Sequence, residues 1–129
     1  MAENRIPHER ALPNYENAVV LRDKLERYCL DSAHVSKTFG SSGKDKARVF
    51  KARLGFGKGD WELLKNRILE ELPYEEATSR DEDEHGKRYT VAVTITGPNG
   101  NTSAVLTAWI VRSGTDFPSL ISARCMRGG

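Results

Sequence analysis

The segment from Tyr89 to Thr96 alternates two kinds of side chain, and this constrains the fold more than any other feature. Tyr89, Val91, Val93 and Ile95 form one set, and threonines and Ala92 form the other. Successive side chains of a β-strand point to opposite faces, so the pattern predicts a half-buried strand. A second layer must then cover the apolar face.

Two or three more strands are predicted around this one. The sequence GPNGN at 97–101 has strong turn chemistry and predicts a hairpin. Strands are expected at Ser103–Arg112 and Ser119–Met126, with SGTD as the turn between them; a four-stranded version adds a short first strand at Glu76–Ser79. Together these segments form an antiparallel meander of three to four strands.

The first half of the chain contains helical periodicity instead. Helices are predicted at about 20–30, from Ser42 to the glycines at 55 and 57, and from Asp60 to Pro73. Their apolar stripes include Ala47, Phe50 and Leu54 in the second helix and Trp61, Leu64, Ile68 and Leu72 in the third. Helices this short need a packing partner.

The predicted fold is therefore α+β, with about three N-terminal helices packed on one face of a C-terminal antiparallel meander. Residues 1–13 contain two prolines and are expected to form an extended arm, and residues 14–129 a single domain. Apolar residues make up 38% and charged residues 29% of the chain, which is typical of a small globular domain.

Several classes of protein are not indicated. No apolar run approaches the roughly 20 residues of a membrane span, and the first residues lack the apolar region of a signal peptide. A cytoplasmic protein that does not bind membranes is expected. Cys29 and Cys125 are expected to be core residues. No HExxH, GxSxG, phosphate-loop or Cys/His metal spacing occurs, so neither a metal nor a cofactor is predicted.

The net charge of +2 conceals an uneven distribution. Residues 22–67 are rich in lysine and arginine, whereas residues 75–84 are acidic. The basic region suits a nucleic acid, although ordinary solvated helix faces explain it equally well.

Sheet alternation also predicts which side chains the helices leave uncovered. If helices cover the face with Val91, Val93, Leu106 and Ile110, the other face is polar. That face is expected to carry Arg88, Thr90, Thr94, Thr107, Trp109, Ser122 and Arg124. Cations, hydroxyls and an indole suit a phosphodiester and a stacked base. The alternatives are that threonine is simply a good strand former and that the N-terminal arm covers Trp109.

His34 is the candidate general base or acid. It lies in a Ser/Gly/Lys-rich loop near Lys37, Lys44 and Lys46. Neighbouring cations favour the neutral imidazole, which can accept a proton. A surface histidine without a function is the alternative reading.

Six segments of the chain resemble a bacterial domain family found at the C-termini of polymorphic and contact-dependent toxins and as free-standing small proteins. They are LPNYENAVV, DKLERYCLDSAH, KARVFKARLGF, RYTVAVTITGPNG, TAWIV and DFPSLISA, and they span about residues 12–124. The order of helices and meander is also similar to that of the metal-independent toxin ribonucleases of the colicin and RelE type.

The resemblance implies an active site on an open sheet face. The implied catalytic residues are His34, Lys46, Arg88, Thr107 and Ser122, with Trp109, Lys44, Arg48 and Arg124 as substrate-binding residues. The chain departs from the pattern in two places: the loop at 35–44 is longer, and Ala92 stands where an acidic residue often occurs.

The expected function is a metal-independent toxin ribonuclease. His34 would act as base or acid, Lys46 and Arg88 would stabilise the charge on phosphorus, Thr107 and Ser122 would orient the phosphate, and Trp109 would stack a base. RNA is the expected substrate, and an acidic immunity or antitoxin protein the expected partner. The rival expectation is a non-catalytic module that binds protein or nucleic acid through the same face in a two-gene bacterial system.

Overall fold

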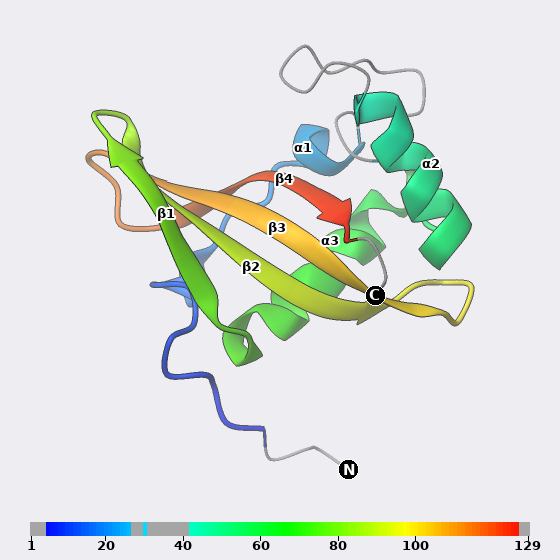
Figure 1. The fold of residues 1–129 in the computed structure, drawn as a ribbon, viewed down its shortest axis with the longest axis horizontal. Helices are drawn as coiled ribbons and strands as arrows, with labels where there is room; N and C mark the ends of the chain where they lie inside the picture. Colours follow the sequence, from blue (N-terminus) through cyan, green and yellow to red (C-terminus); the bar gives the residue numbers. More distant parts are fainter. Residues whose placement is uncertain (1–4, 27–29, 31–41, 127–129) are drawn as a thin grey trace.

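Four antiparallel strands form a single sheet in the order β1-β2-β3-β4 (Figure 1). The computed structural model describes residues 5–26, 30 and 42–126, with the backbone alone for residues 42–46 and 58. The strands are β1 (Ala77–Asp83), β2 (Gly86–Thr96), β3 (Thr102–Arg112) and β4 (Pro118–Cys125). All four strands exist, including the short first one, and β1 continues past its predicted end at Ser79 into the acidic segment.

The helical segments described lie between residues 15 and 74. They are α1 (Arg22–Glu26), α2 (Ser42–Leu54), α3 (Trp61–Glu71) and the single 3-10 turns η1 (Tyr15–Asn17), η2 (Lys58–Asp60) and η3 (Leu72–Tyr74). The α+β class is therefore confirmed. None of the helices in the described ranges is long and apolar enough to cross a membrane.

The ends of α2 and α3 follow from local chemistry. Gly55 ends α2 with a positive φ of 81°, a conformation that glycine adopts without strain. Asp60 precedes α3, as expected, but its carboxylate accepts a hydrogen bond of 2.8 Å from the backbone N–H of Gly57 and not from the helix. The carboxylate thus closes the tight turn that joins the two helices.

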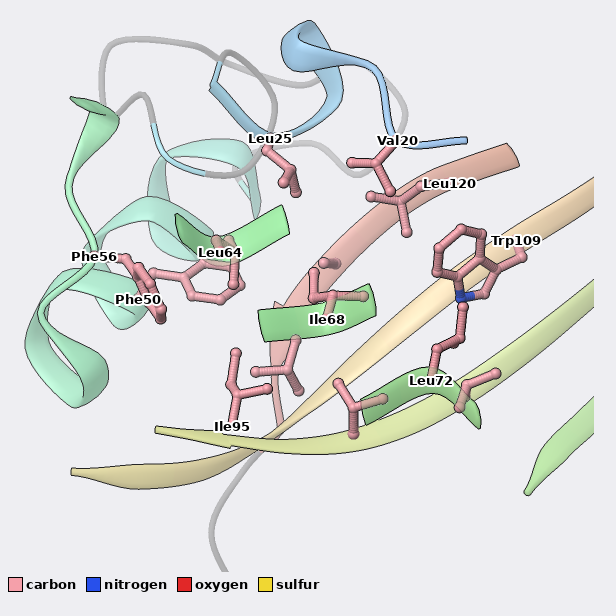
Figure 2. Packing of buried hydrophobic residues seen from close by; sticks show 14 of the residues in the cluster. Val20, Leu25, Phe50, Phe56, Leu64, Ile68, Leu72, Ile95, Trp109 and Leu120 are labelled. Carbon is pink, nitrogen blue, oxygen red and sulfur yellow. The ribbon is translucent and has the colours of Figure 1, made fainter. Parts of the chain in front are cut away.

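The core lies between the helices and one face of the sheet (Figure 2). Phe50 and Leu54 of α2 and Leu64 and Ile68 of α3 are fully buried, which confirms both predicted stripes. The strands contribute buried residues that share one face, called here the inner face: Val91, Val93, Ile95, Val105, Thr107, Trp109, Leu120 and Ala123. One continuous core therefore joins the two halves of the chain.

The turn between β2 and β3 fastens the sheet to the end of α2. The backbone N–H of Asn99 donates to the carbonyl oxygen of Leu54, and its side-chain amide donates to that of Arg53, both at 3.3 Å. A Cβ atom on Gly97 would collide with the Leu54 carbonyl oxygen, so glycine is needed for this close approach. Asn99 thus satisfies helix carbonyls that would otherwise lack partners.

The N-terminal segment docks along the end of α3 and the start of β1. Arg5 makes two hydrogen bonds of 2.9 Å to the Glu71 carboxylate, which hold the pKa of Glu71 below its ordinary value. The Ala77 backbone N–H donates to the Arg10 carbonyl oxygen at 2.8 Å. Leu12 is fully buried, so this segment contributes to the core.

The structure corrects the assignment of faces in β3. Val91 pairs with Thr107, and Tyr89 pairs with Trp109, so Thr107 and Trp109 lie on the inner face and are fully buried. Leu106 and Ile110 lie on the opposite face. The prediction was wrong because both faces of β3 carry apolar side chains, and alternation alone cannot tell which of them meets the helices.

Cys125 packs against the core at the end of β4. Burial raises the pKa of its thiol to about 11, although the nearby Arg53 guanidinium opposes the shift. Cys125 is thus partly buried at the margin of the core that was predicted to contain it, whereas Cys29 lies outside the described residues.

Candidate functional site

The sheet face opposite the core is the candidate site, called here the outer face. The described helices lie on the other side of the sheet (Figure 1). Most of its side chains are small or hydroxylated, and arginines lie on the two edge strands, β1 and β4, and on β2. Its members are Thr78, Arg80, Arg88, Thr90, Ala92, Thr94, Ala104, Leu106, Ala108, Ile110, Ser122 and Arg124.

One row of side chains crosses the whole outer face. Thr78 pairs with Thr90, Thr90 with Ala108, and Ala108 with Ser122, so one residue from each strand lies in line. Neighbouring strands are about 4.8 Å apart, so the row spans roughly 14 Å. It offers three hydroxyl groups and no large side chain. Such a row leaves room for an extended ligand to lie across the strands.

Arg80 reaches over this row from β1. Its Nε donates a hydrogen bond of 2.8 Å to the Oγ1 atom of Thr90. Arg80 is exposed, and no carboxylate of the described chain pairs with its guanidinium. Arg80 was not among the predicted site residues, because the predicted strand ended at Ser79 and Arg80 lies within the acidic segment 75–84.

Arg88 lies on the same face but in a different electrostatic setting. Its Nη1 atom is 3.1 Å from a carboxylate oxygen of Asp81 and 3.0 Å from one of Asp83. The backbone N–H of His85 and then the Arg88 guanidinium hold the pKa of Asp83 below its ordinary value. Arg88 is therefore neutralised within the β1–β2 hairpin.

Thr107 and Trp109 form a closed hydrogen-bond chain inside the core. The indole Nε1 of Trp109 donates to the Thr107 hydroxyl at 2.7 Å, and that hydroxyl donates to the Val91 carbonyl oxygen at 2.7 Å. Both side chains are fully buried. They cannot orient a phosphate or stack a base of a bound RNA, so the placement predicted for them was wrong.

The remaining predicted residues divide into three groups. Ser122, which is half-buried, and the exposed Arg124 lie on the outer face with Arg88, as predicted. Arg48 is exposed on α2, and α2 packs on the helix side of the sheet. His34 lies outside the described residues, as do the side chains of Lys44 and Lys46.

Within the described ranges, no three histidine, cysteine or carboxylate side chains come together in an arrangement that could hold a metal ion. The chemistry that the outer face offers in these ranges is that of guanidinium and hydroxyl groups, which donate hydrogen bonds to anionic oxygens.

Comparison with known proteins gives one match. Residues 11–126 match the family described as domain of unknown function DUF6883, so the match covers all four strands and α1, α2 and α3. No curated protein and no solved structure matches the chain. The chain belongs to the DUF6883 family.

Proposed function

We propose that the chain is a toxin-type ribonuclease that works without a metal, cleaves cellular RNA in the cytoplasm and is neutralised by a cognate immunity or antitoxin protein. One observation carries the proposal: the outer face presents Arg80 and Arg124, which pair with no carboxylate of the described chain, together with three aligned hydroxyls, and its β2–β4 part contains no carboxylate. Guanidinium and hydroxyl donors on an open face suit the phosphodiester backbone. The resemblance to toxin domains along residues 12–124 supports the same reading.

The proposed reaction needs no group beyond RNA and protein side chains. A base removes the proton of a 2′-hydroxyl, whose oxygen attacks the adjacent phosphorus. The bond from phosphorus to the 5′-oxygen of the next nucleotide breaks, and an acid protonates that oxygen. The products are a 2′,3′-cyclic phosphate and a free 5′-hydroxyl. Donors that fix the non-bridging oxygens stabilise the charge that develops on phosphorus.

The roles are assigned from the residues that face the substrate. Ser122 and Arg124 hold the phosphate on β4, whereas Arg88 is paired with Asp81 and Asp83 and holds the β1–β2 end of the face together. His34 remains the proposed base or acid, and Lys46 the proposed stabiliser of the charge on phosphorus. Lys44 and Arg48 are proposed to bind the RNA beyond the sheet. Thr107 and Trp109 have no role, because both are buried.

A second candidate is a non-catalytic module that binds protein or nucleic acid through the outer face. Two observations favour it: the burial of Thr107 and Trp109 removes two expected contacts, and Asp81 and Asp83 already neutralise Arg88. Of the two histidines in the described ranges, His8 lies in the N-terminal arm and His85 in the β1–β2 turn. Catalysis thus depends on His34, whereas binding does not.

Purified protein incubated with RNA and a chelator separates the two candidates. The ribonuclease produces fragments with cyclic phosphate ends, and it leaves the same RNA intact when every 2′-hydroxyl is methylated. His34→Ala should lower the cleavage rate by about 10²–10⁴-fold, the usual contribution of a positioned acid or base. His8→Ala is the matched control. Intact RNA with the wild-type chain would reject the enzyme.

Expression in a bacterium without the neighbouring gene tests the toxin assignment. Growth arrest with fragmented RNA supports it, and restored growth on co-expression of an acidic neighbour identifies the immunity partner. An acidic partner should cover the outer face, so Arg124→Glu should weaken the complex through repulsion. Normal growth with intact RNA favours the binding module.

A further inference from the structure

We propose that Arg80, held in place by Thr90, is a phosphate-binding residue of the outer face in addition to Ser122 and Arg124, and that its ligand is one phosphodiester of a single-stranded RNA. The inference rests on the proposed function for the identity of the ligand. It concerns binding alone, so it can fail or succeed independently of cleavage. Arg88, which the sequence favoured for this task, is assigned a structural role.

The hydrogen bond of Arg80 determines how its guanidinium is presented. Nε is committed to Thr90 Oγ1 at 2.8 Å, which fixes the plane of the group over the sheet. The two terminal nitrogens have no partner among the described residues. A planar guanidinium with two free terminal nitrogens can donate hydrogen bonds to two oxygens of one phosphate. Because the hydrogen bond to Thr90 already fixes the guanidinium, less conformational entropy is lost when the phosphate binds.

Thr90 contributes a second donor at the same place. Its Oγ1 accepts the hydrogen bond from Arg80, and its own hydroxyl proton has no acceptor within the described chain. A hydroxyl can donate once while accepting. The proton is therefore free to bind an anionic oxygen beside the guanidinium. Arg80 and Thr90 thus form one site from adjacent strands, in line with Thr78, Ala108 and Ser122.

Arg88, unlike Arg80, is paired with carboxylates. Two carboxylates contact its Nη1 atom, and its side chain is only 29% exposed. A phosphate that approached Arg88 would meet Asp81 and Asp83 at the same time, and like charges repel. The pairing instead ties β1 to β2 across the irregular register between Ser79 and Glu82. The two arginines therefore differ in whether their charge is available to a ligand.

The positions of Arg80 and Arg124 suggest the path of the RNA. Arg80 lies on β1 and Arg124 on β4, so the two cations lie on the two edge strands of the sheet. The row from Thr78 to Ser122 joins the two sides with small side chains. A strand of RNA that crosses the sheet can contact both cations. A face with small side chains between two cations suits single-stranded RNA, whose bases are not held in a helix.

Binding of a short 2′-O-methyl RNA with a fluorescent label tests the inference by anisotropy, because this probe cannot be cleaved by the proposed reaction. Arg80→Gln should weaken binding about tenfold, the loss of about 1.4 kcal/mol, and lower the slope of log affinity against log salt by about 1. Lys65→Gln on α3 is the matched control and should change affinity less than twofold. Arg88→Gln should have a smaller effect than Arg80→Gln.

Thr90→Val separates positioning from charge. It should weaken binding several-fold in the wild-type background and much less in an Arg80→Gln background, because Thr90 acts partly through Arg80. Circular dichroism and thermal unfolding confirm that each variant is folded. Equal losses for Arg80→Gln and Lys65→Gln, or a larger loss for Arg88→Gln, would overturn the inference. So would a wild-type chain that does not bind the probe, whether or not it cleaves unmodified RNA. Binding as expected without cleavage would reject the ribonuclease and keep the site.

Discussion

The two faces of the sheet carry the same local motif with opposite consequences. On the inner face, Thr107 accepts a hydrogen bond of 2.7 Å from the Trp109 indole nitrogen. On the outer face, Thr90 accepts one of 2.8 Å from the Arg80 Nε. Thr107 also donates to the Val91 carbonyl oxygen and is fully buried, whereas the Thr90 hydroxyl proton has no acceptor among the described residues.

The comparison shows that residue type alone does not distinguish a structural hydroxyl from a functional one. The Thr107 hydroxyl accepts one hydrogen bond and donates another inside the core, where an unsatisfied indole N–H would destabilise the fold. Thr90 keeps a donor that solvent or a ligand can reach. Mutations on the inner face should therefore change stability, and mutations on the outer face should change binding.

The largest expected loss of stability comes from a substitution on the inner face. Trp109→Ala should lower the free energy of unfolding by about 3–5 kcal/mol, because it removes a fully buried ring and leaves a cavity. Urea unfolding measures the change. Trp61→Ala is the matched control: Trp61 is only half-buried and should cost less. Equal losses at the two positions would contradict the placement of Trp109.

A matched pair of valine substitutions tests the motif directly. Thr107→Val should cost about 1–3 kcal/mol, because it leaves the Trp109 indole N–H without its acceptor and removes the hydroxyl that donates to the Val91 carbonyl oxygen. Thr90→Val should change stability by less than about 0.5 kcal/mol, as surface substitutions usually do. Thermal unfolding of both variants under the same conditions gives the comparison, and the reverse order would refute it.

Arg88→Gln should lower the free energy of unfolding less than Thr107→Val does, and it should change the pKa of Asp83 measurably. The pKa of Asp83 should rise toward its ordinary value but not reach it, because the His85 backbone N–H also holds it down. A carboxyl with a lowered pKa stabilises the fold above its ordinary pKa and loses this contribution as pH falls through the lowered value. Carboxyl NMR titration measures the shift. An unchanged Asp83 would show that Arg88 is not its partner.

The smallest structural perturbation concerns the thiol at the end of β4. In a Cys29→Ser background, Cys125 should react slowly with an alkylating reagent near neutral pH, because a pKa of about 11 leaves little thiolate. Unfolding in urea should accelerate the reaction as the pKa returns to about 8.5. Equal rates in the folded and unfolded chain would contradict the burial of this side chain.

Much of the fold was predictable from local patterns. Phe50 and Leu54, like Ile68 and Leu72, recur at helical spacing, and Val91, Val93 and Ile95 alternate against threonines and alanine, so these elements and their buried sides were identified. Strand β3 was different. Val105 and Trp109 lie on one face and Leu106 and Ile110 on the other, so its pattern fits either orientation.

The position of the hairpin turn between β2 and β3 determines which face of β3 is buried. Residues of β2 and β3 that are equidistant from Asn99 pair with each other, as Thr96 does with Thr102 and Val93 with Val105. Counting outward from a turn centred on Asn99 therefore places Thr107 opposite Val91 and assigns Thr107 and Trp109 to the inner face. The partners of Arg80 and Arg88 were not predictable, because they depend on the irregular register between β1 and β2.

An NMR titration with a short 2′-O-methyl RNA tests most directly whether the outer face is the functional one. The account predicts shifts of backbone amides that centre on Arg80, Thr90 and Ser122, together with a shift of the Arg80 Nε–H signal. The indole N–H of Trp109 and the amides of α3 should stay in place. Shifts that centre on α3 or on the Trp109 indole, with the outer face unchanged, would contradict the account.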